Sequence, residues 1–83
     1  MKIELLGTWI ETDTISSISS IENIGLYVPQ YNFKINISGE IKEIWCNALD
    51  KKDLIEVRDE LIRIWQGKTK TTTAIDFNTV RIK

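Results

Sequence analysis

The clearest pattern of apolar and polar positions along the chain is helical and covers residues 50–66. Apolar side chains recur there at intervals of three and four residues, which places them on one face of an α-helix: Leu54, Val57, Leu61, Ile64 and Trp65. Asp50 is positioned to cap the first turn, and Gly67 is a natural left-handed end. The pattern therefore predicts an amphipathic helix that covers a sheet or a second helix.

Arg58 is a charged residue near the centre of this apolar face. In one interpretation its aliphatic stem lies along the edge of the core and its guanidinium reaches water. In the other, the guanidinium pairs with a carboxylate from a strand, stacks on Trp65 or faces a partner chain. A fully buried, unpaired arginine is excluded because desolvating a lone charge costs too much free energy.

Residues 33–38 show the clearest strand pattern, since apolar and polar side chains alternate there. Ser38 and Gly39 suit a hairpin turn that leads into residues 40–49. That second segment has two interpretations, because its apolar residues would also line a helix. The hairpin signal and the β-branched and aromatic side chains favour a strand.

Two more strands are predicted at the start of the chain, over residues 2–6 and 8–12, with a bulge or tight turn at Gly7. Residues 14–24 then carry isoleucines at every third position, a spacing that fits neither a helix nor a strand well. Serine and β-branched isoleucine favour a bulged strand there. A short helix capped by Asp13 is the alternative.

Residues 23–32 contain the only proline of the chain and read as a loop, or as a strand interrupted by Pro29. Tyr27, Val28 and Tyr31 make this loop more apolar than a solvated connection usually is. The favoured interpretation is that the loop packs over the edge of the core. The functional interpretation is that it binds a partner.

The end of the chain combines a polar segment with a strand-like one. Residues 68–73 are rich in threonine and lysine and predict a flexible connection or an edge strand. Residues 74–83 include Phe77 and predict a strand whose alternation slips at Asn78 and Thr79, where a bulge or turn is expected. This strand either closes its own sheet or adds to the sheet edge of a neighbouring chain.

Together these elements predict an α+β fold, in which an antiparallel sheet of four to five strands carries one helix on a face and is followed by a C-terminal strand. The chain has 83 residues, which predicts a single small domain over residues 1–83 with a thin core. Oligomerisation is a common means of stabilising such a core.

Composition removes most catalytic chemistry from consideration. The chain has no histidine and one cysteine, and it carries no nucleophile motif, glycine-rich phosphate loop or metal-ligand spacing. We therefore expect no enzymatic activity, no cofactor and no metal site. Cys46 is expected to be a small buried residue in a reducing compartment. The sequence contains no membrane span or signal peptide, which predicts a cytoplasmic protein, and its isoleucine, lysine and asparagine content hints at a bacterial or phage genome.

The charge is nearly balanced, at −1 overall, but the C-terminal end is basic. Its basic residues are Lys68, Lys70, Arg81 and Lys83. These side chains could contact phosphate, so weak nucleic-acid binding is the alternative function. The acidic N-terminal half and the absence of a recognition motif count against it.

The favoured prediction is a non-enzymatic protein–protein interaction module that acts as a homo-oligomer or as an accessory or inhibitory subunit. Tryptophan, tyrosine and arginine are the usual anchors of such interfaces. The candidate interaction residues are accordingly Arg58, Trp65, Tyr27, Tyr31 and Phe77.

Overall fold

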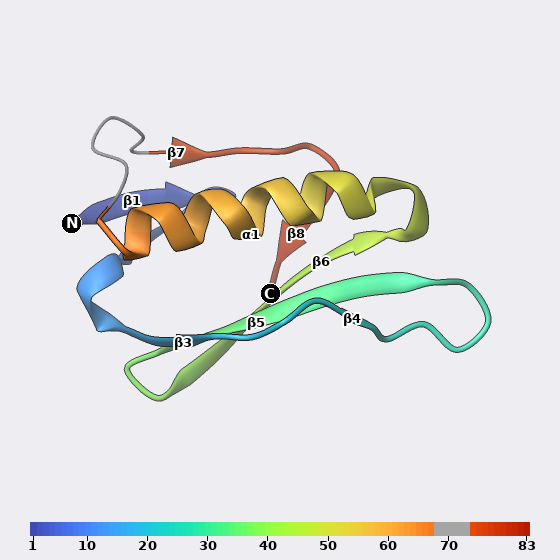
Figure 1. Ribbon diagram of the computed structural model, residues 1–83, viewed down its shortest axis with the longest axis horizontal. Coiled ribbons are helices and arrows are strands. Elements are labelled where there is room, and N and C mark those ends of the chain that lie inside the picture. The colour runs from blue at the N-terminus through green and yellow to red at the C-terminus, as the bar shows by residue number, and fades with distance from the viewer. Residues whose placement is uncertain (68–73) are drawn as a thin grey trace.

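The structure is a computed structural model that describes residues 1–67 and 74–83, and it contains two β-sheets that pack against one helix (Figure 1). The helix is α1 (Lys51–Trp65). The larger sheet is antiparallel and consists of β3 (Ile15–Ile18), β4 (Glu22–Asn23), β5 (Gln30–Ile37), β6 (Glu40–Asn47) and β8 (Val80–Ile82). The smaller sheet consists of β1 (Lys2–Leu5), β2 (Thr8–Glu11) and β7 (Ala74–Ile75). Two short 3-10 helices are η1 (Thr12–Thr14) and η2 (Ala48–Asp50). The predicted α+β class is confirmed.

Helix α1 forms where the apolar pattern predicts it. Its buried side chains are Leu54, Val57, Leu61 and Ile64. Gly67 has a φ of 74°, the left-handed conformation expected after a helix end. Two details differ from the prediction. Asp50 occupies the N-cap position but its side chain makes no capping hydrogen bond. Trp65 is 37% exposed and anchors the end of the helix through its indole N–H, which donates to the carbonyl of Ile15 at 3.1 Å.

Strands β5 and β6 form the predicted hairpin, which settles the ambiguity of residues 40–49 for the strand. Ser38 and Gly39 both have positive φ, at 52° and 87°. Two consecutive residues of this kind form the turn whose twist matches that of paired strands. The side chain of Asn36 accepts a hydrogen bond from the backbone N–H of Gly39 at 2.9 Å and stabilises the turn.

The segment with isoleucines at every third position is a bulged strand, as predicted, and not a short helix. The pairing of β3 with β5 changes register between Ile15 and Ser17. This extra residue lets Ile15 be buried and Ile18 be half-buried, although an unbroken alternation would point them to opposite faces. Asp13 lies in η1, before the strand.

The smaller sheet was not predicted from the sequence as a separate sheet. Its β1–β2 hairpin turns through Leu6 and Gly7, with φ of 51° and 84°. Its third strand, β7, runs parallel to β1 and pairs Leu5 with Ile75. The C-terminal segment is thus divided into two strands that join different sheets, and both pair within the chain.

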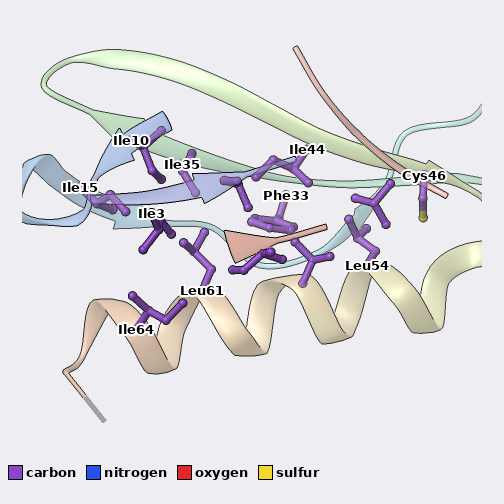
Figure 2. Close-up of a cluster of buried hydrophobic side chains, with 14 residues drawn as sticks. Ile3, Ile10, Ile15, Phe33, Ile35, Ile44, Cys46, Leu54, Leu61 and Ile64 are labelled. Carbon is purple, nitrogen blue, oxygen red and sulfur yellow. The ribbon is translucent and has the colours of Figure 1, made fainter. Parts of the chain in front are cut away.

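The core lies between the helix and the inner faces of both sheets (Figure 2). Phe33 and Ile44 are paired across β5 and β6 and are completely buried above the helix. Almost every strand contributes to this cluster, whose members are Ile3, Leu5, Ile10, Ile15, Phe33, Ile35, Ile44, Cys46, Leu54, Val57, Leu61, Ile64, Ile75 and Val80. One continuous core therefore joins the two sheets.

Cys46 belongs to this core, as predicted, and its side chain is 0% exposed. Burial raises the pKa of its thiol above the ordinary value of 9.0, and the carboxylate of Asp50 raises it further. The thiolate is the reactive form, so the folded protein should react with Ellman's reagent at pH 8 on the order of 100-fold more slowly than the protein in urea. Above pH 9 the unfolded chain loses this proton first, so the thiol's contribution to stability should fall as pH rises. Equal rates with and without urea would show that Cys46 is accessible.

Candidate protein-interaction site

The five predicted interaction residues do not form one surface. Tyr31 lies in β5 and is half-buried. The amine of Lys51, the first residue of α1, lies 4.6 Å from its ring centroid. Trp65 lies at the other end of the same helix, roughly 20 Å away for a helix of this length. Phe77 is half-buried against the core between β7 and β8.

Arg58 takes neither of the two predicted arrangements in full, because its guanidinium bonds to the backbone of its own chain. It is partly buried, and its Nε donates a hydrogen bond to the backbone carbonyl of Ser19 at 2.7 Å. Across residues 1–67 and 74–83, no carboxylate lies within salt-bridge distance of its guanidinium. Arg58 therefore fastens α1 to the segment between β3 and β4 within this chain.

Tyr27 has the most exposed aromatic side chain in the described structure, and it does not stand alone. It is 98% exposed, and its neighbours Leu26 and Val28 are 93% and 67% exposed. The favoured prediction, that this loop packs over the edge of the core, is wrong for Tyr27 and Val28 but right for Tyr31, which is half-buried against the core. The three apolar side chains point into solvent from the connection between β4 and β5.

The loop that carries them is held in a defined shape. The side-chain oxygen of Asn23 accepts hydrogen bonds from the backbone N–H groups of Gly25 at 3.0 Å and Gln30 at 3.4 Å. Ile24 N–H donates to the carbonyl of Gln30 at 2.7 Å and closes the base of the loop. Gly25 is required because a Cβ at this position would lie 1.8 Å from the carbonyl oxygen of Val28. These contacts hold the apolar side chains in place without burying them.

Leu49 extends this surface. It is 97% exposed in η2, which follows β6 directly. Gln30 and Asn47 are paired in the β5–β6 ladder, so the loop before β5 and the turn after β6 leave the same end of the sheet. Figure 1 shows both at one end of the molecule. We call this surface the apolar end, and it consists of Ile24, Leu26, Tyr27, Val28 and Leu49.

Charges of both signs border the apolar end. Glu22 precedes the loop on β4, and Asp50, Lys51 and Lys52 follow Leu49 at the start of α1. This border has no excess of either sign, so it gives no attraction to a strongly charged ligand such as nucleic acid. Apolar side chains surrounded by mixed charges are typical of a surface that contacts another protein.

The structure also has a groove of about 540 Å³ between α1 and the stretch that contains β7. Its lining is mostly acidic and apolar: Glu56, Asp59, Glu60, Arg63, Ala74, Ile75, Asp76 and Phe77. Its titratable groups are four carboxylates and one guanidinium, and none of the eight residues carries a thiol, hydroxyl or imidazole group. In the part of the chain that the structure describes, no cluster of three or more acidic, cysteine or histidine side chains is arranged to hold a metal ion.

The predicted nucleic-acid contacts are only partly visible. Arg81 and Lys83 project from the same face of β8, and Arg81 is paired with Trp45. The amine of Lys83 is 3.4 Å from the carboxylate of Glu43 and lies 5.4 Å from the Trp45 ring centroid. Its charge is thus partly neutralised within the chain. Lys68 and Lys70, with the predicted flexible connection at 68–73, lie outside the described residues.

Comparison with known proteins gives no match, whether to a family model, a curated protein or a solved structure. Within residues 1–67 and 74–83, no helix is both long and apolar enough to cross a membrane.

The sequence prediction missed Leu26, Val28 and Leu49 as candidate interaction residues. A signal for the first two was present, since the apolar run lies between Gly25 and Pro29, two residues that favour turns. Leu49 lies between Asn47 and the helix start in a segment that also fits a helical pattern, so its exposure could not be read from the chain.

Proposed function

We propose that the protein is a non-enzymatic protein-interaction module, a homo-oligomer or an accessory or inhibitory subunit, and that the apolar end is its contact surface. The observation that carries the proposal is the display of Leu26 and Tyr27, at 93% and 98% exposure, on a loop fixed by internal hydrogen bonds. A soluble fold gains nothing from holding such side chains in water, whereas a binding surface gains pre-organisation.

The apolar side chains of the surface supply a large part of the free energy that binding requires. Full burial of an apolar side chain of this kind contributes about 1.5–3 kcal/mol, so the four most exposed members together offer about 6–12 kcal/mol. Association costs an estimated 4–15 kcal/mol in lost freedom of motion, and a fixed loop keeps the additional cost of ordering low. Polar contacts from the border would supply the rest of the free energy that binding requires.

Replacing both Leu26 and Tyr27 with serine is the direct test. Because both side chains are exposed, the free energy of unfolding should change by about 0.5 kcal/mol or less for each substitution. Binding should weaken by about 30-fold or more, the effect of removing an interface anchor worth 2 kcal/mol. The measurement is photo-crosslinking in the cells of origin from a photoreactive residue at position 28, in chains that are otherwise wild type or carry the double substitution.

Trp9→Ser provides the matched control, since Trp9 is also exposed, at 63%, but lies on β2 in the smaller sheet. This variant should give the same crosslinked products as the wild-type chain. The proposal is wrong if the double variant retains every crosslink of the wild type, or if the wild-type protein forms none and is monomeric at all concentrations.

A further inference from the structure

We propose that the apolar end binds a second copy of this chain, so that two molecules join end to end about a two-fold axis. The inference rests on the proposed function and names the partner of the same surface. In a two-fold contact the same patch meets itself, so an apolar patch is complementary to its own copy without requiring a recess in the partner.

The charges around the patch are compatible with this partner. Glu22 and Asp50 are acidic, whereas Lys51 and Lys52 are basic, so the border carries two charges of each sign. Because the border carries both signs, a contact between two copies can place acidic side chains of one molecule near basic side chains of the other. A patch bordered by charges of one sign would repel its own copy. The apolar end is bordered by charges of both signs, so it does not.

The area of the patch sets the expected strength. From the transfer energies of aliphatic side chains and the area of a tyrosine, the apolar end offers roughly 350–600 Å² per copy, or about 700–1,200 Å² for the pair. This range lies below the roughly 1,200–2,000 Å² of stable specific interfaces and matches that of weak, transient ones. The expected complex is a reversible dimer with a dissociation constant on the order of micromolar or weaker.

The position of the patch sets the expected shape. The Cα trace measures 39 × 25 × 20 Å, and the apolar end lies at one end of the longest dimension (Figure 1). A dimer joined through this end is therefore elongated, with a maximum dimension about twice that of one molecule. Side-by-side pairing through the free edge of β2, β7 or β8 would leave the maximum dimension much closer to that of the monomer.

The experiment is a concentration series in sedimentation velocity and small-angle X-ray scattering, from about 1 µM to 1 mM in protein. The wild-type protein should change from monomer to an elongated dimer over this range. The dimer of the Leu26→Ser, Tyr27→Ser double variant should have a dissociation constant at least about 30 times higher. The Trp9→Ser variant should match the wild type within about threefold.

Four results would overturn the dimer. The first is a wild-type protein that stays monomeric to 1 mM. The second is a dimer whose dissociation constant the double variant leaves unchanged, and the third is a dimer whose maximum dimension equals that of the monomer. The fourth is a monomer that co-sediments with phosphatidylcholine vesicles only when Leu26 and Tyr27 are present, which would assign the apolar end to lipid. If the chain is monomeric but the crosslinks from position 28 still depend on Leu26 and Tyr27, the dimer is rejected and the interaction function stands. If those crosslinks are also absent, both fail.

Discussion

Replacing Phe33 with alanine is expected to lower the free energy of unfolding by about 3–5 kcal/mol, the cost of removing a fully buried phenylalanine. Phe33 lies in the middle of β5, is 0% exposed, and is the largest fully buried side chain of the core. A chain of this size has a total stability of only about 4–12 kcal/mol. The variant should therefore lose between about a quarter and all of the stability of the folded chain.

The measurement is urea denaturation followed by tryptophan fluorescence, with Lys34→Ala as control. Lys34 is the next residue of the same strand and its side chain faces solvent, so its removal should change the stability by about 0.5 kcal/mol or less. If Phe33→Ala lowers the stability by less than about 1 kcal/mol, the core is not organised around β5 as described.

Replacing Gly25 with alanine is expected to weaken association through the apolar end by about tenfold or more, with a loss of stability of about 1–3 kcal/mol. The new Cβ would overlap the carbonyl oxygen of Val28, so the loop backbone must move. Leu26 and Tyr27 lie directly between these two residues and would be displaced with it. Sedimentation velocity and urea denaturation on the same preparation separate the two effects.

Gly7→Ala is the matched control for this substitution. Gly7 has a φ of 84°, so alanine should cost about 1–2 kcal/mol of left-handed strain, but no atom lies within 4 Å of the new Cβ. This variant should lose stability while associating normally. Should Gly25→Ala associate as well as Gly7→Ala, the shape of the loop is not what determines binding.

The elements that sequence reasoning predicted correctly are those whose pattern is local. The helix has an apolar face over four turns that only Arg58 interrupts, and the apolar residues of β5 alternate up to a turn of Ser38 and Gly39. The phase slip at Asn78 and Thr79 also indicated a real boundary, because β7 and β8 lie on either side of it. In these cases the spacing of a few residues is sufficient to define the structure.

The missed features depend on contacts that no short stretch of sequence reveals. Strand β7 has only two residues, too few for any alternation, and it exists because Ile75 pairs with Leu5 far away in the chain. The apolar end was misjudged for a different reason. Leucine, tyrosine and valine are buried more often than not when they occur in a small domain, and only the fixed backbone around Gly25 shows that they are displayed.

The parallel pairing of β1 with β7 determines when this protein can complete its fold. Strand β7 supplies the third strand of the smaller sheet, and β8 pairs with β6 in the larger sheet. Both sheets are thus completed by residues 74–83, far along the chain from β1 and β6. Contacts of such large sequence separation slow folding, because the intervening chain must first be closed into a loop. We therefore expect the domain to unfold in one cooperative step, and removal of residues 74–83 to destabilise both sheets together instead of shortening one.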